Sequence, residues 1–191
     1  MMIETKKHIR LLAAAFDANP SVNWVIKNDR FRKKRILALS DYSYKTAFIR
    51  QGIALSSDQQ GIALCYRYNS HKTSLSDYWN QIQLIFRAIG ISRTKEILRR
   101  EHYLKRHRPA SGDFLYFWFL GVNPEARGSG SAKELKDRIF HKSRKEQLPI
   151  YLETSVERNK NVYQRYGFEI YHTWNVNEKL TLWMMKRDWD K

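Results

Sequence analysis

Residues 114–132 read FLYFWFLGVNPEARGSGSA, and this stretch decides the fold. Its first nine residues are a continuous apolar and aromatic run of strand length, which predicts a strand buried on both faces at the centre of a sheet. Gly128 and Gly130 follow, just before a segment of helical periodicity. Glycines in such a place leave backbone N–H groups uncovered at a helix N-terminus, so the loop suits a phosphate group. The alternative is only a tight connection between strand and helix, because short glycine motifs often occur by chance.

The sequence downstream of this loop alternates between helical and extended patterns. We expect a helix over 132–140, a strand over Ile150–Thr154, a short helix over 162–166 ended by Gly167, and a closing hairpin of 168–174 and 180–186. The succession of strand, helix, strand, helix and hairpin predicts a mixed α/β fold.

Upstream, helical spacing of apolar residues alternates with one polar, glycine-containing turn. We expect helices over 9–16 and 31–42 with a break at Asn19-Pro20, a hairpin of Ile53–Leu55 and 62–68, a helix over 78–89 interrupted by Gly90, and a further helix to 104 capped by Ser92 or Thr94. The first half therefore predicts helices followed by antiparallel strands.

The length of 191 residues predicts a single domain over 1–191. A composition that is 42% hydrophobic and 14% aromatic excludes disorder for most of the chain. Cys65 is a single cysteine, so it cannot form an internal disulfide, and no Cys and His cluster has metal-ligand spacing. We therefore expect no metal site and a reducing, cytoplasmic location.

Neither a membrane span nor a secretory signal is predicted. The longest apolar run, 114–122, is much shorter than the roughly 20 residues that a spanning helix needs. Basic residues precede the apolar segment 11–16 as they do in a signal, but the segment is short and Asp17 ends it.

The chain carries 35 Lys and Arg against 19 Asp and Glu, a formal net charge of +16. Such a charge favours an anionic partner, whether a nucleotide, a nucleic acid or a membrane surface. Basic runs at 30–35 and 93–108 make nucleic-acid binding a competing hypothesis. No named nucleic-acid motif is present, so solvated helix faces or a rim that attracts a nucleotide explain these runs better.

Three elements together resemble the GNAT superfamily of acetyl-CoA-dependent N-acetyltransferases. Residues 127–132, RGSGSA, match its Gln/Arg-x-x-Gly-x-Gly/Ala signature after a central strand, with Ser131 where an aliphatic residue is usual and Ala132 where glycine is commoner. Residues 151–168 then follow its pattern of strand, Asn and Tyr-x-x-x-Gly-Phe, and 182–187 resemble the closing Trp-x-Met-x-Arg strand of small-molecule members. The resemblance covers 114–187.

The resemblance implies a central mixed, mostly antiparallel and twisted sheet of about six to seven strands, flanked by helices, with a splayed central strand pair. It also implies acetyl-CoA as cofactor. The pantetheine arm would bond the backbone of Leu120, Gly121 and Val122, and the diphosphate would lie on the N–H groups of 127–132. The implied cofactor contacts are thus Leu120, Gly121, Val122, Arg127, Gly128, Ser129, Gly130, Ser131, Ala132, Asn159 and Tyr163. The Arg127 side chain can also point away, and Asn159 is alternatively a helix N-cap.

For catalysis, the resemblance favours Tyr163 as the acid that protonates the departing thiolate, because a phenol is neutral at neutral pH. Periodicity alone would place Tyr163 in the core. Glu153 is a candidate base for the amine proton, directly or through water; its alternative is a surface or paired charge. The implied reaction is direct attack, in a ternary complex, by a primary amine of a small-molecule acceptor. A catalytically silent fold that binds acyl-CoA remains an alternative, and the oligomeric state, monomer or homodimer, is open.

The acceptor itself is not identified by the sequence. In relatives, the helices between the first hairpin and the central strand shape its pocket, so the helical segment 69–110 is the expected acceptor side. Its candidate lining residues are Tyr78, Trp79, Phe86, Glu96 and Glu101, for which core or surface is the simpler interpretation.

Overall fold

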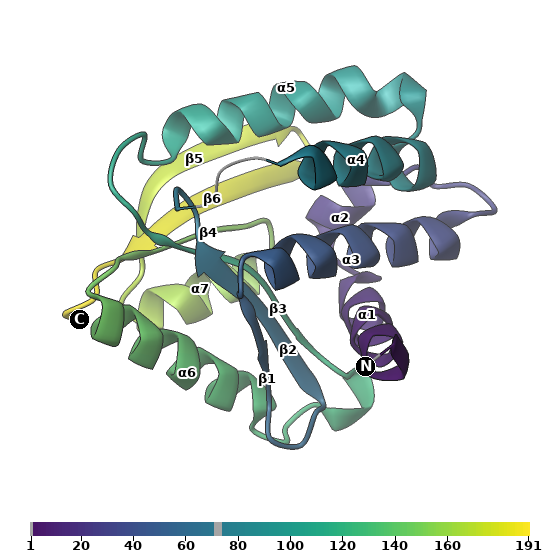
Figure 1. Ribbon diagram of the computed structural model, residues 1–191. Coiled ribbons are helices and arrows are strands. Elements are labelled where there is room, and N and C mark those ends of the chain that lie inside the picture. Colours follow the sequence, from purple (N-terminus) through teal and green to yellow (C-terminus); the bar gives the residue numbers. More distant parts are fainter. Residues whose placement is uncertain (1, 71–73) are drawn as a thin grey trace.

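The computed structural model describes residues 2–70 and 74–191 (Figure 1). The helices are α1 (Met2–Phe16), α2 (Pro20–Val25), α3 (Arg32–Ile49), α4 (Leu75–Leu84), the π-helical turn η1 (Ile85–Ile89), α5 (Ile91–His107), the 3₁₀ turn η2 (Pro124–Ala126), α6 (Ser131–Glu146) and α7 (Glu157–Arg165). The strands are β1 (Ile53–Leu55), β2 (Gly61–Arg67), β3 (Leu115–Val122), β4 (Ile150–Thr154), β5 (Glu169–Asn177) and β6 (Leu180–Arg187).

The six strands form one sheet in the order β1-β2-β3-β4-β6-β5. All neighbouring pairs are antiparallel except β3 and β4, which are parallel. The predicted mixed, mostly antiparallel sheet of six to seven strands is thus confirmed with six, and the quoted apolar run occupies its centre.

Helices cover both faces of the sheet (Figure 1). On one face, α1 and α3 contribute Leu12, Phe16 and Ile36 to a core that includes Phe114 and Tyr116 of the central segment. A second core lies on the other face, where Leu135, Ile139 and Phe140 of α6 pack with Leu115, Phe117 and Leu152. Strand alternation explains this division, because successive side chains of β3 point to opposite faces.

A β-bulge at Trp118 interrupts that alternation. Leu64 pairs with Phe119 while its neighbour Cys65 pairs with Phe117, so Trp118 is the extra residue of β3. Trp118 and Phe119 consequently both pack on the α1 and α3 side. The bulge separates the buried first half of β3 from its half-buried second half.

Several predicted boundaries were wrong for local reasons. Asn19-Pro20 begins α2 and does not simply break the chain, because the Asn19 side chain accepts hydrogen bonds from two helix N–H groups and Pro20 takes the first helical position. A capping box of Ser74 and Asp77 starts α4 at Leu75, three residues before the predicted start.

The predicted cap of the next helix was also wrong. α5 starts at Ile91, directly after Gly90 in a positive-φ conformation, and Thr94 is already inside the helix. The Thr94 hydroxyl donates back to the Gly90 carbonyl. The sequence predicted a strand buried on both faces over 114–122, but only 114–117 are fully buried, since the rest of β3 is half-buried apart from Gly121.

Candidate functional site

β3 and β4 separate soon after they begin to pair. Only Leu115 with Ile150 and Tyr116 with Tyr151 are in register, although β3 continues to Val122 and β4 to Thr154. This splay confirms the predicted separated central pair. Beyond Tyr116, the edge of β3 that faces β4 has no strand partner in the described chain.

The backbone direction along β3 decides which groups reach this open edge. Gly121 pairs with Ile62 of β2, and the Asn123 N–H donates to the Gln60 carbonyl on the same side. Because backbone groups alternate along a strand, the N–H and C=O of Leu120 and Val122 point toward β4.

Gly121 therefore differs from its two neighbours in the predicted cofactor set. Its backbone is directed toward β2. A Cβ at this position would lie 2.7 Å from the Ala15 Cβ of α1. The glycine is thus needed for the close approach of that helix to β3.

The glycine loop follows the open edge directly. Gly128 and Gly130 have φ values of +92° and +88°, and a Cβ at either position would meet nothing within 4 Å. The Ser129 N–H is bonded inward, to the Ala126 carbonyl at 3.2 Å. The N–H groups of Gly128 and Gly130 have no hydrogen-bond partner among the described residues.

The first turn of α6 extends this set of open donors. The first intrahelical backbone bond runs from the Glu134 N–H to the Gly130 carbonyl. The Ala132 and Lys133 N–H groups therefore remain without intrahelical acceptors, as is general at a helix start. Positive partial charge at this helix end adds to the attraction for an anion.

Ser131 and Ala132 occupy very different environments. Ser131 is buried, and its hydroxyl donates to the carboxylate of Asp58 in the turn between β1 and β2. Ala132 is exposed. Serine replaces the usual aliphatic residue at this position, and its hydroxyl has a polar partner, Asp58, on the neighbouring hairpin.

Arg127 and Asn159 are both exposed. Arg127 follows η2 in an extended conformation. The predicted N-cap role of Asn159 is wrong, because α7 begins at Glu157 after Val156 and Asn159 lies inside its first turn. The helix predicted over 162–166 begins five residues earlier, so it includes Asn159.

Tyr163 lies on the α6 and α7 side of the sheet, against the strand that opens. Its ring packs edge-on to Phe117 of β3, with centroids 6.2 Å apart, and to Phe168 at 5.4 Å. Burial, with a smaller contribution from Tyr166, raises the pKa of Tyr163 to about 12. Its hydroxyl donates to no group within the described part of the chain and is neutral at physiological pH.

Glu153 lies on β4, in a buried ion pair with Arg108. The Arg108 Nε and Nη2 atoms donate to its two carboxylate oxygens at 2.8 and 3.0 Å, and the Tyr116 hydroxyl donates to it at 2.6 Å. The Arg108 guanidinium also lies over the Tyr116 ring, 4.3 Å from its centroid. Glu153 therefore has the environment of a paired charge.

Arg108 was missed by the sequence analysis as a site residue. It follows α5, is only 7% exposed, and also donates to the Tyr68 hydroxyl. Burial opposes the charge of Arg108, but the combined attraction to Glu153, Tyr116 and Tyr68 and the hydrogen bonds to Glu153 outweigh it and raise the pKa of Arg108 well above its ordinary value. No local pattern reveals it, because its partner lies 45 residues away.

Two buried hydroxyls near the splay were also missed. The Ser155 Oγ, directly after β4, and the Tyr171 hydroxyl of β5 have no hydrogen-bond partner among the residues that the structure describes. Burial, and to a lesser degree the charge of Glu153, raise the pKa of Tyr171. Both are orphaned polar atoms of the kind that a bound molecule satisfies.

The predicted acceptor-side segment forms α4, η1 and α5, apart from residues 71–73, which lie outside the described residues. Tyr78, Trp79 and Phe86 are 57%, 60% and 64% exposed, so they are not core residues. Glu96 and Glu101 are exposed and form ion pairs with Arg93 and Arg100.

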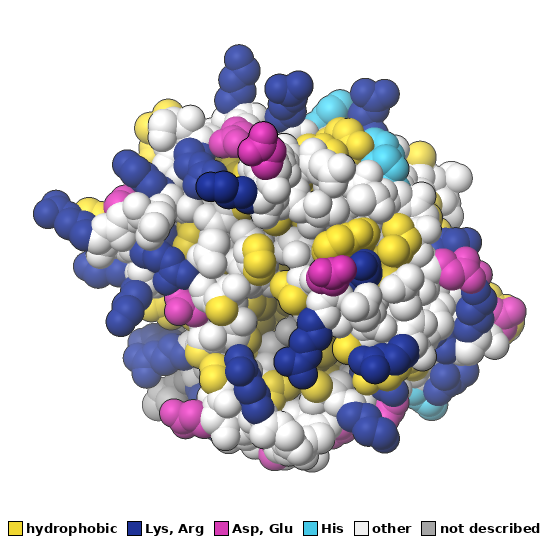
Figure 2. All heavy atoms as spheres, turned by 180° about the vertical axis from the view of Figure 1, so that it is seen from behind, with side chains coloured by type: hydrophobic (Ala, Val, Ile, Leu, Met, Phe, Trp, Pro, Cys, Tyr) yellow, Lys and Arg dark blue, Asp and Glu magenta, His cyan; other side chains and the backbone are white. Residues whose placement is uncertain are grey.

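Many residues of the basic runs are engaged within the protein. Arg35 pairs with Asp29, Arg93 donates to the Ile26 carbonyl, and Arg100 donates to the Ser21 hydroxyl. Figure 2 shows many Lys and Arg side chains around a shallow hollow with exposed hydrophobic atoms. The overall positive field remains, but these contacts give no specific support to a nucleic-acid surface.

Two other kinds of function, membrane insertion and cysteine nucleophilic chemistry, find no support among the described residues. No described helix has the length and apolar character to cross a bilayer. Cys65 is buried, and burial raises the pKa of its thiol to about 12, so it is no nucleophile. The open edge of β3, the unbonded loop N–H groups and the orphaned hydroxyls do fit an extended ligand with a diphosphate.

Comparisons with known proteins agree with this geometry. Residues 87–168 match the model of the Acetyltransferase (GNAT) family. An uncharacterized N-acetyltransferase of Schizosaccharomyces pombe is 36% identical over 77 residues, which cover 38% of this chain and 31% of that protein. The match thus spans about a third of the length of the curated relative.

Solved structures show the same fold at low identity. The histone acetyltransferase HPA2 and related acetyltransferase from Corynebacterium glutamicum aligns with a TM-score of 0.70 and 18% identity, covering 98% of this chain and 93% of that chain. Arylalkylamine N-acetyltransferase 2 from Aedes aegypti aligns with a TM-score of 0.61 and 15% identity, covering 98% and 95%. The family match over residues 87–168 and the shared strand order show that the chain has the GNAT fold and that this part of it is similar to GNAT acetyltransferases.

Proposed function

We propose that this protein transfers an acetyl group from acetyl-CoA to a primary amine of a small-molecule acceptor. The observation that carries the proposal is the continuity of two features: the open edge of β3 leads directly into the loop with unbonded N–H groups. The open strand edge matches the amide-containing pantetheine arm, and the unbonded loop N–H groups match the diphosphate.

In this proposal the backbone groups of Leu120 and Val122 bind the pantetheine arm. The N–H groups of Gly128, Gly130 and Ala132 bind the diphosphate. The remaining loop residues and Asn159 border this path, while Gly121 contributes by admitting α1. Acetyl-CoA would supply the acyl group as a thioester, already activated toward an amine.

Tyr163 is the proposed acid. Its ring is fixed by Phe117 and Phe168 on the side of the splay where α7 follows β4. A neutral phenol without another partner can hydrogen-bond or protonate the sulfur that leaves. Burial favours the neutral form that this role requires.

Glu153 is the proposed proton acceptor, directly or through water. Arg108 and Tyr116 fix its carboxylate beside the splay. Because Glu153 is on the same face of β4 as Tyr151, it packs toward the α1 and α3 side, whereas Tyr163 packs toward α6 and α7. An amine that enters from the first side would meet the acyl group between the two residues.

The test is the release of free thiol from acetyl-CoA across a panel of small amines, peptides and aminoglycosides, after calorimetry has measured CoA binding. Binding together with amine-dependent thiol release supports the proposal. Binding without turnover on any amine favours a silent acyl-CoA-binding fold. No binding of CoA, with salt-sensitive binding of random DNA, favours the nucleic-acid alternative.

A further inference from the structure

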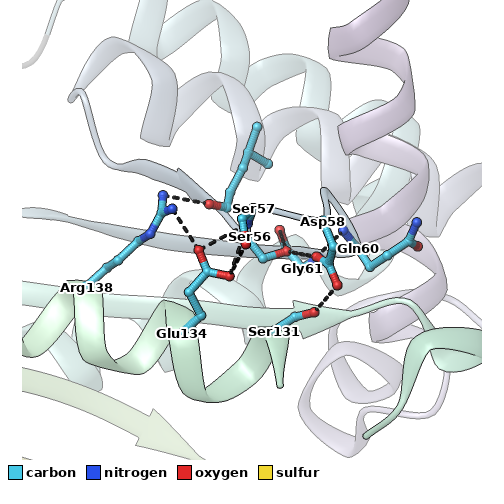
Figure 3. Close-up of polar contacts among 9 residues, drawn as sticks. Ser56, Ser57, Asp58, Gln60, Gly61, Ser131, Glu134 and Arg138 are labelled. Atoms are coloured by element: carbon cyan, nitrogen blue, oxygen red, sulfur yellow. Dashed lines mark hydrogen bonds and ion pairs between the residues drawn. The ribbon is translucent and has the colours of Figure 1, made fainter. Parts of the chain in front are cut away.

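The first two turns of α6 are attached to the turn between β1 and β2 by a set of polar side chains (Figure 3). Ser131, Glu134 and Arg138 lie on one face of the helix, at spacings of three and four residues. The Ser131 hydroxyl donates to Asp58, and the Arg138 Nη1 atom donates to the Leu55 carbonyl at 2.9 Å.

Glu134 makes the second carboxylate contact of this junction. Its oxygens accept hydrogen bonds from the Ser57 N–H at 3.0 and 3.1 Å and from the Ser57 hydroxyl at 2.8 Å. It also pairs with Arg138 at 2.7 Å. The helix is therefore attached to the turn at three successive positions of one face.

Asp58 is the centre of the arrangement beside the loop. One of its oxygens accepts from the Ser56 hydroxyl at 2.5 Å and from the Gln60 N–H at 2.9 Å, and the other accepts from Ser131 at 2.7 Å. These hydrogen bonds, that of Ser56 first, lower the pKa of Asp58 to about 2. The carboxylate is therefore ionised throughout the physiological range.

The contact reaches the glycine loop itself through Ser129. The Ser129 and Ser131 hydroxyl oxygens are 2.5 Å apart. Because Ser131 gives its hydrogen to Asp58, Ser129 must be the donor of this bond. Ser129 is thereby drawn toward the hairpin, between the two glycines whose N–H groups stay unbonded.

Gly61 makes this close approach possible. A Cβ there would lie 2.8 Å from a methyl group of Leu135 and 3.1 Å from the Ser131 Cβ. An aliphatic side chain in place of Ser131 would need room at the same contact. A small hydroxyl residue paired with Asp58 fits a helix start that is close to the strand.

A carboxylate near a diphosphate site opposes anion binding by simple electrostatics. We propose that Asp58 is a positioning residue, which fixes Ser131 and Ser129 so that the N–H groups of Gly128, Gly130 and Ala132 are arranged for the diphosphate before it binds. The inference rests on the proposed function. Pre-arrangement increases affinity because the loop does not have to be ordered on binding.

The two effects of Asp58 have opposite signs, so a substitution separates them. If Asp58 positions the loop, Asp58→Ala weakens CoA binding about tenfold, the equivalent of one or two hydrogen bonds. If its charge is what matters, the same variant strengthens CoA binding. Glu125→Gln is the matched control, since Glu125 is an exposed carboxylate of the glycine loop whose side chain accepts no hydrogen bond from the described residues.

The experiment is calorimetry of CoA with the wild type, Asp58→Ala, Ser131→Ala, the double variant and Glu125→Gln. Both single variants should bind CoA more weakly, and the double variant no more weakly than Asp58→Ala, because the two groups act as one unit. Pantetheine, which lacks the diphosphate, should bind all variants within about twofold by ligand-observed NMR. Glu125→Gln, which removes a charge of the loop but no hydrogen bond, should bind CoA no more weakly than the wild type.

Each failure points to a different conclusion. A wild type that binds no CoA removes the proposed function. If the wild type binds and Asp58→Ala binds equally or more tightly, the positioning role is overturned. Equal losses of affinity for CoA and for pantetheine also overturn it, as do additive losses of CoA affinity in the double variant. If Asp58→Ala does not fold, the comparison of Ser131→Ala with the wild type decides the test.

Discussion

Tyr163 has a packed ring and a hydroxyl with no hydrogen-bond partner in the part of the chain that the structure describes. Replacing it by Phe removes the hydroxyl alone and leaves the packing intact. We expect Tyr163→Phe to lower kcat about a hundredfold, the usual contribution of an acid catalyst. CoA affinity should stay unchanged and unfolding free energy should change by less than about 0.5 kcal/mol. Steady-state kinetics and calorimetry on one preparation measure all three.

The pH profile provides the control for this assignment. Since the pKa of Tyr163 is raised to about 12, the phenol keeps its proton throughout the range from pH 7 to 9. A fall of wild-type kcat on raising the pH from 7 to 9 that Tyr163→Phe abolishes would contradict a neutral acid. Unchanged turnover in the variant would assign Tyr163 to the core alone.

The sequence could predict single residues only where a motif or periodicity names them. Tyr163 and the two glycines are named in this way, and their local conformations are decided by neighbours in the chain. Asp58 was read as part of a polar turn, because nothing local shows that Ser131, 73 residues later, donates to it. Arg108 was one of many basic residues for the same reason.

At the scale of elements, the contact of α1 with β3 depends on Gly121. A Cβ at this position would lie 2.7 Å from the Ala15 Cβ, nearer than real Cβ atoms approach. We expect Gly121→Ala to lower the unfolding free energy by about 1 to 3 kcal/mol, as overpacking generally does. Urea unfolding followed by circular dichroism measures the loss.

The matched control removes the other carbon of this contact. Ala15→Gly alone should cost about 1 kcal/mol, because glycine lowers helix stability. The double variant Ala15→Gly with Gly121→Ala should be more stable than the sum of the single losses. Strict additivity would show that the two elements do not meet here.

The ion pair of Arg108 and Glu153 joins the end of α5 to β4. Both side chains are nearly inaccessible, at 5% and 6% exposure, so removing one leaves a buried charge without its partner. We expect Arg108→Ala to lower the unfolding free energy by about 3 to 5 kcal/mol. Chemical denaturation of the variant beside wild type measures it.

Arg106→Ala is the matched control, because Arg106 is an exposed arginine in the last turn of α5, two residues before Arg108. Its change should stay within about 0.5 kcal/mol. Adding Glu153→Ala to Arg108→Ala should cost little more, since the two charges are coupled. A loss in Arg108→Ala no larger than that of Arg106→Ala would argue against the buried pair.

Elements were predictable where hydrophobic period and turn chemistry agreed. The strands at Ile53–Leu55 and Ile150–Thr154 have the predicted bounds, because each is a short, largely apolar run between turn-forming residues. The bulge at Trp118 was not predictable, because an unbroken apolar run has no period to show where an extra residue lies. The helix α2 was missed because Asn19-Pro20 suits both a turn and a helix start.

At the scale of the whole molecule, the splay divides the candidate site between two cores. Tyr163 packs with the core that contains α6, while Tyr151 on the side of Glu153 packs with the core that contains α1 and α3. A shift of either helical layer would therefore change the distance between proposed acid and base. Substitutions that disturb the packing of either core should therefore also change the rate of acetyl transfer.

Buried phenols connect the stability of both cores to alkaline pH. Burial is the main reason that the pKa values of Tyr66, Tyr116, Tyr163 and Tyr171 are raised, that of Tyr163 to about 12. An unfolded chain releases these protons near pH 10, whereas the folded chain retains them to higher pH. The folded state therefore has this stabilisation in full below pH 10 and loses it as pH rises, by about 2 kcal/mol for Tyr163 alone at pH 12.

We expect a cooperative unfolding step above pH 10, in which phenolate absorbance rises together with the loss of far-ultraviolet circular dichroism. Several of the 11 tyrosines should ionise only in that step. Tyr163→Phe should fall in stability less steeply with pH, because it lacks one of these phenols, and should leave the behaviour at neutral pH unchanged. If all phenols titrate smoothly while the circular dichroism stays native, the buried phenols are not linked to folding in this way.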